Sequence, residues 1–351
     1  MSHIKQFREI FATSFKDPAR WVDWFFANVA TDDDRVFIQH DGSRPASALY
    51  VQDYDFAYAG RTLPSAYISC VATRPEFRGK GLASQLMVKT LRELREKGYA
   101  FAELIPQTDA LYFFYAHTGF SGCVYRAEER YSAVHAFASE GCRTIGGDYA
   151  LLHRLEEESG WGVRHSEEDF RNVLADLDME PGHQTIATEA PDGSRAMLFA
   201  SLENTGKDST VLVRSLLAES QQAADAALAE LRKTVGERPM TVLRPASDEP
   251  RARLRAAGMV RITDPLRVLG ALADAHRDLR YTIRLTDRQI PENCGIYTLR
   301  DGICVLDAGF GGKADLEVDI RTLTAILFSP HDTGAIFSLP TRRPYMALML
   351  D

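Results

Sequence analysis

The chain has 351 residues, of which 45% are hydrophobic and 26% are charged, and its formal net charge is −8 at pH 7. This length suits two or three domains, and the composition is typical of a soluble globular protein. The negative charge disfavours nucleic acid as a general partner, because a polyanion repels it, and it is compatible with a cationic amine substrate.

Targeting and metal-binding signals are missing from the sequence. No apolar run approaches the ~18–20 residues that span a bilayer, and the N-terminal segment MSHIKQFREIF carries charges through its apolar stretch, unlike a secretory signal. The five cysteines form no CxxC pair and show no zinc-like spacing with histidine. We therefore expect a cytoplasmic protein without a metal and without a membrane contact.

The first part of the chain is predicted to alternate helices and strands. Apolar residues at helical spacing predict amphipathic helices, and runs bounded by Asp-rich and Gly-containing turns predict strands. The expected helices cover residues 4–15 and 21–28, and the expected strands cover residues 35–39, 46–58 and a segment that ends at Thr73.

A glycine turn follows the last of these strands. Residues 66–73 (AYISCVAT) are extended in pattern, residues 78–81 read Arg-Gly-Lys-Gly, and residues 82–97 are strongly helical. The first amides of a helix have no intrahelical partner, and the helix dipole adds partial positive charge there. The turn is therefore expected to bind an anion, usually a phosphate.

The side chains of the turn fit this purpose. Gly79 and Gly81 let the backbone approach a ligand where a Cβ would clash. Arg78 and Lys80 supply positive charge, and Arg78 is able to bind a pyrophosphate with both arms of its guanidinium group. The spacing matches neither the Walker loop nor the dinucleotide fingerprint, because Leu82 follows Gly81. It fits Arg/Gln-x-x-Gly-x-Gly/Ala.

This pattern resembles the acyl-coenzyme A loop of the GNAT N-acetyltransferases. A predicted strand at residues 101–105 and the segment Phe114–Phe120 (FYAHTGF) follow in the order that the GNAT fold requires. The resemblance implies acetyl-coenzyme A as co-substrate. It assigns the pantetheine contacts to backbone groups of the strand and the pyrophosphate contacts to the turn, which together comprise Val71, Ala72, Thr73, Arg78, Gly79, Lys80, Gly81, Leu82, Ala83 and Ser84.

The middle of the chain echoes the first part. Helices are predicted at residues 148–158, 166–177 and 223–235, and strands at 184–188, 196–202, 210–217 and 240–243, with a short helix at 252–257. We interpret this order as a degenerate second GNAT copy. Residues 218–222 (AESQQ) stand where a glycine turn would be, and Glu219 would repel phosphate, so this copy is expected to act as a scaffold.

The last part of the chain forms a third unit. A helix at 266–276, strands at 280–285, 295–299 and 302–308, and a helix with an Asp cap at 319–326 are predicted. Residues 290–297 and the helical region 316–328 resemble a sterol-carrier-like domain. The fold class is therefore mixed α/β, with a catalytic GNAT domain at 1–145, a degenerate GNAT-like domain at 146–258 and a sterol-carrier-like domain at 259–351.

Together these parts are similar to the enhanced intracellular survival acetyltransferases. The resemblance implies transfer of acetyl from acetyl-coenzyme A to a small-molecule primary amine, and a homo-oligomer. It also implies that Tyr115 is the general acid, and a phenol with a pKa near ~10 matches a thiol leaving group.

The general base has two candidates in the sequence. The resemblance implies the C-terminal carboxylate, here that of Asp351, and the preceding apolar run MALML suits a buried tail. Glu103, on the strand beside the glycine turn, is a second candidate that would act through water. An acidic and aromatic segment, comprising Asp53, Tyr54, Asp55 and Tyr58, is a candidate for holding the cationic amine.

Two other functions are open from the sequence. The chain could be a regulatory or ligand-binding protein that binds coenzyme A with little turnover. It could also bind lipid through its C-terminal domain, although the short predicted strands give no sign of a long apolar tunnel. Arg78, Gly81 and Tyr115 favour the enzyme.

Overall fold

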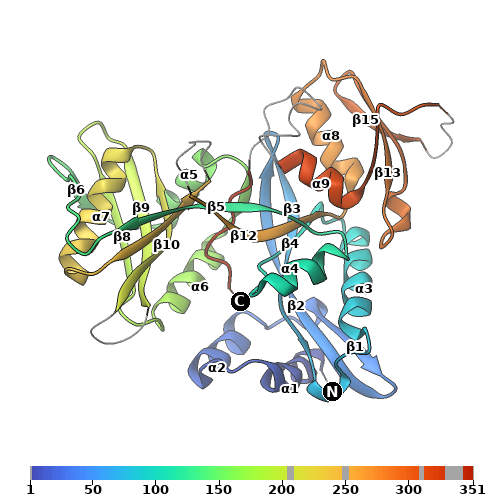
Figure 1. Ribbon diagram of the computed structural model, residues 1–351, viewed down its shortest axis with the longest axis horizontal. Coiled ribbons are helices and arrows are strands. Elements are labelled where there is room, and N and C mark those ends of the chain that lie inside the picture. Colours follow the sequence, from blue (N-terminus) through green and yellow to red (C-terminus); the bar gives the residue numbers. More distant parts are fainter. Residues whose placement is uncertain (1, 204–208, 247–252, 308–311, 329–342, 351) are drawn as a thin grey trace. The chain divides into compact units, whose positions relative to one another are not determined.

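Helices and strands alternate along the chain, and the fold is of the mixed α/β class that the sequence predicts (Figure 1). The computed structural model describes residues 2–203, 209–246, 253–307, 312–328 and 343–350. Two compact units are present, and the first combines residues 1–124 with 258–343, whereas the second combines 125–257 with 344–350. Because one compact unit can contain more than one domain, the predicted division into three domains stays a prediction.

The first unit begins with two aromatic helices, as predicted. They are α1 (His3–Ser14) and α2 (Ala19–Asn28), which lie side by side (Figure 1). Ser2 caps α1 by accepting a hydrogen bond from the Lys5 amide. Buried aromatic rings hold the two helices together and pack them on the sheet, namely Phe7, Phe11, Phe25, Phe26 and Tyr50.

The sheet of the first unit carries the predicted glycine turn. Three antiparallel strands lead to helix α3 (Leu82–Glu96), and the chain then returns in β4 (Phe101–Leu104), which is parallel to β3. Helix α4 (Asp109–Ala116) follows β4. The antiparallel strands are β1 (Val36–Asp41), β2 (Arg44–Tyr58) and β3 (Arg61–Thr73).

The second unit repeats this order, in agreement with a second GNAT-like copy. Three antiparallel strands lead to helix α7 (Gln221–Val235), and β11 (Met240–Pro245) returns parallel to the third of them. The alanine-rich face of α7 is buried against these strands. The three strands are β8 (Gln184–Glu189), β9 (Arg195–Glu203) and β10 (Thr210–Ala218).

Shorter elements precede these strands in the second unit. Strand β6 pairs with β8, and α6 begins with a capping box in which Ser166 and Asp169 bond each other's backbone. The elements are β6 (Arg143–Ile145), α5 (Tyr149–Glu158), β7 (Gly162–Arg164) and α6 (Glu167–Leu177).

The last strand of each copy is supplied by the other half of the chain. Strand β5 (Ser121–Tyr131) follows the first copy in sequence, but its residues 126–131 pair with β11. Strand β12 (Arg253–Ile262) follows the second copy, but its residues 259–262 pair with β4. The exchange means that neither copy has a complete sheet without the other half of the sequence.

The helix predicted at residues 252–257 is wrong, because residues 253–257 belong to β12. Arg253 and Arg255 both reach Glu128 of β5 at 3.7 Å, which places alternate side chains on one face as in a strand. Arg, Leu and Ala are strong helix formers, but pairing in a sheet overrides this local preference.

The C-terminal part of the first unit is a four-stranded sheet with order β15-β14-β13-β16 and two helices. The predicted helical region 316–328 is wrong at its start, because Leu316–Asp319 form strand β16, parallel to β13. Asp319 then caps the next helix by accepting the Thr322 amide at 2.7 Å, as predicted. The other elements are α8 (Pro265–Ala275), β13 (Tyr281–Thr286), β14 (Gly295–Arg300), β15 (Ile303–Asp307) and α9 (Ile320–Phe328).

A buried ion pair ties this C-terminal part to the GNAT helices of the same unit. Arg261 of β12 donates to both carboxylate oxygens of Asp287, at 2.9 and 2.8 Å, and both side chains are fully buried. Its other arm donates to the Thr118 carbonyl, just beyond α4, at 2.9 Å. A Cβ on Gly119 would lie 1.8 Å from that guanidinium group, so only glycine fits there.

Asn293 extends the same network to the helix that follows the glycine turn. Its amide group donates to Asp287 at 3.0 Å, and its oxygen accepts from Arg95 of α3 at 2.7 Å. Gln289 donates to the His117 carbonyl at 2.9 Å. Side chains and backbone from residues 287–293 therefore fix α3 and the end of α4.

We predict that Asp287→Ala lowers the free energy of unfolding by about 3–5 kcal/mol, because it leaves the Arg261 charge buried without its partner. Guanidinium chloride unfolding of the whole chain measures the change. The control is Asp23→Ala, which removes an exposed partner of Arg8 on helix α2 and should stay within about 0.5 kcal/mol of the wild type. Equal losses in the two variants would contradict a special role for the buried pair.

Candidate active site

Strands β3 and β4 separate beyond their first residues. Within the described part of the chain they pair only through Ser65–Tyr67 and Phe101–Glu103. Further along β3, the pairing with β2 shifts by one residue, and Cys70 has a φ of 53°. This bulge bends β3 away from β4. A sequence pattern does not predict this bulge, because a positive φ is rare for cysteine.

A cavity of about 80 Å³ lies where the two strands separate. Residues 67–71 of β3 form one wall, and Leu104 and Ile105 form another. Tyr115 of α4 and two phenylalanines of the first helix region, Phe11 and Phe15, complete the apolar lining. Sequence reasoning missed the two phenylalanines, since nothing in their spacing distinguishes them from ordinary core residues.

The structure places Tyr115 in this cavity. Its side chain is buried, with 6% of its surface exposed, and it packs against Phe114 and Phe120 of the same motif. Among the described residues its hydroxyl has no hydrogen-bond partner. Burial raises the pKa of Tyr115 above its ordinary value of 10, and the nearby Cys70 adds to the rise. The phenol therefore holds its proton at neutral pH.

The glycine turn has the backbone geometry of an anion site. Gly79 and Gly81 have φ values of 77° and 74°, and Gly81 is the N-cap residue of α3 without a side-chain cap. An added Cβ at either position would meet nothing within 4 Å. Within the protein itself, these glycines are therefore needed for the left-handed backbone, and the space that they would leave to a bound ligand stays a prediction. The first amides of α3, at Leu82, Ala83 and Ser84, start the helix without a capping side chain.

The two cations of the turn make contacts of their own. Arg78 Nε donates to the Thr73 carbonyl at 3.1 Å, which closes the turn onto the end of β3. Lys80 Nζ lies 2.7 Å from a carboxylate oxygen of Asp41, and both side chains are partly exposed. An exposed pair of this kind contributes little, so an arriving anion can compete with Asp41 for Lys80.

Glu103 of β4 is fully buried. Ser65 donates a hydrogen bond to its Oε1, and its Oε2 has no partner among the residues that the structure describes. Burial raises the pKa of Glu103 from 4.5 to about 7, and the Ser65 hydrogen bond opposes the rise. This carboxyl group is thus able to exchange a proton near neutral pH.

Two residues of the predicted amine-holding segment have partners within the protein. Asp53 lies 2.5 Å from Arg35 and accepts the Tyr99 hydroxyl at 2.5 Å. Tyr58 is fully buried, and its ring packs against Phe101 and against Phe328 of α9. Their predicted role in holding an amine stays a prediction. Tyr54 is buried as well, and Asp55 is exposed.

Asp351 lies outside the described residues, so its predicted role is untested. The tail before it packs within the second unit. Tyr345 exchanges backbone hydrogen bonds with Trp161 and Val163, and its hydroxyl lies 2.7 Å from Ser215 Oγ. Met346, Ala347 and Leu350 are also buried. The apolar end of the chain is therefore a docked segment.

The matching turn of the second copy does not have the geometry of an anion site. Ser220 caps α7 by accepting the Ala223 amide at 3.1 Å, which uses one of the donors that a phosphate would need. Glu219 accepts the Arg195 amide at 2.8 Å and pairs with Arg154 at 2.5 Å. A side-chain cap and an acidic neighbour agree with the predicted scaffold role.

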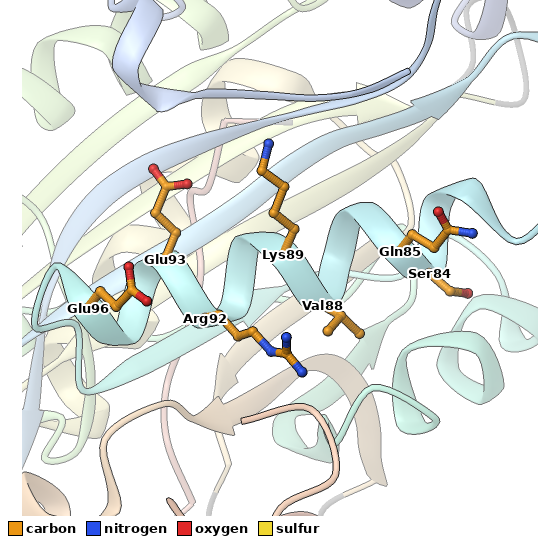
Figure 2. Close-up of a pocket in the computed structure, with 7 residues that line it drawn as sticks. All are labelled: Ser84, Gln85, Val88, Lys89, Arg92, Glu93 and Glu96. Carbon is orange, nitrogen blue, oxygen red and sulfur yellow. The ribbon is translucent and has the colours of Figure 1, made fainter. Parts of the chain in front are cut away.

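A second hollow, of about 570 Å³, runs along the outer side of α3. Figure 2 shows its lining side chains projecting from successive turns of this one helix, with Ser84 and Gln85 at the end near the glycine turn and Glu96 at the other. Its lining side chains include both positive and negative ones, such as Lys89 and Glu93, and the hollow is open to solvent. Tyr115 does not line it.

Within the described ranges, no group of three or more His, Cys, Asp or Glu side chains is placed to hold a metal ion. No described helix is both long and apolar enough to cross a membrane.

Family comparisons agree with the geometry. Residues 1–123 match the acetyltransferase (GNAT) domain family, and residues 266–335 match the sterol carrier protein domain family. No curated protein matches the sequence. The chain thus carries an acetyltransferase (GNAT) domain in its first third and a sterol carrier protein domain toward its C-terminus.

Solved structures share the fold over nearly the whole chain. A GCN5-related N-acetyltransferase from Anabaena variabilis has a TM-score of 0.73 at 17% identity, covering 93% of this chain and 88% of its own. Eis1 from Mycobacterium abscessus has a TM-score of 0.70 at 14% identity, covering 97% and 95%. A GCN5-related N-acetyltransferase from Kribbella flavida has a TM-score of 0.71 at 22% identity, covering 97% and 90%. The similarity to the enhanced intracellular survival fold is confirmed.

We predict that Glu103→Gln flattens the pH dependence of stability between pH 4.5 and about 7. Because the pKa of Glu103 is higher in the folded than in the unfolded chain, the folded chain holds this proton more tightly. The proton therefore stabilises the fold below pH 4.5, and this stabilisation is lost as pH rises to about 7. The shift corresponds to about 3 kcal/mol. The variant should therefore be more stable than the wild type at pH 8 and equal to it at pH 4.

Urea unfolding at both pH values measures the difference. Glu96→Gln is the matched control, since Glu96 is exposed on α3 and should leave the pH dependence unchanged. A Glu103→Gln variant with the wild-type pH dependence would show that Glu103 ionises normally.

Proposed function

We propose that this protein is an acetyl-coenzyme A-dependent N-acetyltransferase that transfers acetyl to a small-molecule primary amine. The observation that carries the proposal is the buried Tyr115 hydroxyl in the cavity where β3 and β4 separate. The cavity lies beside the part of β3 that leads into the glycine turn, so a single extended co-substrate can reach both. The acceptor is expected to be an amine rather than a nucleic acid, in keeping with the net charge of −8.

Coenzyme A would be held by backbone groups more than by side chains. The pyrophosphate would accept hydrogen bonds from the amides of residues 79–84, and Arg78 and Lys80 would add charge. The pantetheine arm would lie along Val71, Ala72 and Thr73, on the side of β3 that β4 leaves open. Contacts through the backbone of a strand tolerate many side chains. The recognisable sequence pattern is therefore found in the turn and not in the strand.

The transfer itself needs a proton acceptor and a proton donor. A neutral amine attacks the thioester carbonyl, and the Val71 amide would polarise the carbonyl oxygen. The thiolate leaves as the carbon–sulfur bond breaks, and Tyr115 would donate its proton to the sulfur. The support for this role is the position of the Tyr115 hydroxyl in the cavity, because the raised pKa keeps the phenol protonated but makes it a weaker acid than a free phenol.

The base that removes the ammonium proton is proposed to be the C-terminal carboxylate of Asp351, as the resemblance implies. Glu103 is the second candidate, and its pKa and its hydrogen bonding support it. Its pKa of about 7 matches the working pH of a general base, and one of its oxygens is unpaired among the described residues. Its route to the amine would pass through water.

We predict that Tyr115→Phe lowers kcat by about 100-fold or more while the affinity for coenzyme A changes little, because the ring still packs and only the donated proton is lost. Thiol release from acetyl-coenzyme A measures kcat, against a panel of aminoglycosides, polyamines and lysine peptides. Tyr112→Phe is the control, since Tyr112 lies on the same helix outside the cavity lining. Equal turnover in the Tyr115 variant would remove it from the mechanism, and binding without turnover on any amine would favour a binding protein.

We predict that adding a few residues after Asp351 abolishes turnover and leaves coenzyme A binding intact, if the terminal carboxylate is the base. The same assay measures the extended chain beside the native one. The competing outcome has two parts. The extended chain would keep full activity, and Glu103→Gln would lose the change in kcat/KM that the wild type shows near pH 7. That result would assign the base to Glu103 instead.

A further inference from the structure

The first helix region contributes two aromatic side chains to the cavity lining. Phe11 lies in α1 with 2% of its surface exposed, and Phe15 directly follows α1 and is half-buried. Both residues line the cavity together with residues 67–71 of β3. The exposed lining residues are polar and comprise Asp17 and Gln107.

Chain direction decides which part of the co-substrate would meet these side chains. The glycine turn follows the C-terminal end of β3, so a pantetheine arm that starts at the turn runs back along β3 toward residues 71–67. Its thioester would then reach the cavity beside Tyr115. The acyl group, which lies beyond the sulfur, would point toward Phe11 and Phe15.

We propose that Phe11 and Phe15 set an upper limit on the acyl group and restrict the co-substrate to short-chain acyl thioesters such as acetyl-coenzyme A. The inference rests on the proposed function and deepens it. The cavity of about 80 Å³ equals the liquid volume of about two to three water molecules. An acetyl group has roughly this bulk, whereas a hexanoyl chain is far larger.

Moving Phe11 and Phe15 to admit a longer acyl chain would cost free energy. The Phe11 and Phe15 rings lie 4.6 Å apart. Phe11 also contacts Trp21 and Phe25 of α2, with ring centroids at 6.3 and 6.4 Å, and Phe26 at 5.7 Å. Moving Phe11 would disturb this whole aromatic cluster, because buried side chains are packed without spare volume. Each extra methylene in a filled apolar pocket changes discrimination by roughly 10- to 200-fold.

The test measures binding of hydrolytically stable thioether analogues of acetyl-, propionyl-, butyryl- and hexanoyl-coenzyme A by calorimetry. In the wild type, we expect the hexanoyl analogue to bind at least about tenfold more weakly than the acetyl analogue. Phe15→Ala should bring the two affinities to within about threefold by enlarging the cavity. Phe113→Ala is the matched control, since Phe113 is 72% exposed on α4 and should keep the wild-type ratio.

Each outcome assigns the result to one claim. Equal affinities for all chain lengths in the wild type would overturn the inference, and so would an unchanged ratio in Phe15→Ala. If the wild type does not bind coenzyme A itself, the proposed function is overturned instead. If Phe15→Ala fails to fold, Phe15→Leu keeps an apolar side chain at that position and still enlarges the cavity, so the same shift in ratio is required.

Discussion

The buried pair of Arg261 and Asp287 is the contact on which the arrangement of the first unit depends. A guanidinium group removed from water needs a carboxylate and further acceptors, and here it finds them in Asp287 and in the Thr118 carbonyl at the end of α4. Burial lowers the pKa of Arg261, and Asp287 opposes that effect. Gly119 is glycine because the guanidinium group occupies the place of its Cβ. The sterol carrier part of the chain therefore helps to hold the helix that carries Tyr115.

The two GNAT-like copies show how little separates a ligand site from a scaffold. Both have three antiparallel strands, a helix and a parallel return strand. In the first copy, Gly81 leaves the helix start open, with no side chain on its amides. In the second copy, Ser220 occupies an amide and Glu219 adds negative charge beside it. A change of cap residue is enough to remove an anion site, since the dipole and the amides are otherwise the same.

Burial gives the candidate active site its chemistry. It raises the pKa values of Tyr115 and Glu103, so the phenol stays protonated and the carboxyl group exchanges a proton near pH 7. Phe11 and Phe15 add apolar side chains to the lining of the cavity that holds Tyr115. The proton affinities of the proposed acid and of the second candidate base therefore share one cause, which is the burial of these side chains away from water.

Local patterns in the sequence determined the helices and strands around the glycine turn, the turn itself and the Phe114–Phe120 segment, because periodicity and backbone chemistry act over a few neighbouring residues. Tertiary structure alone decided what depends on distant partners. The strand at residues 253–257 forms beside β5, against its helical composition. The bulge at Cys70, the exchange of β5 and β12, and the volume left between Phe15 and Tyr115 follow from how separate elements meet. A pattern along the chain carries no record of which strand pairs with which, nor of the space that remains once they pack.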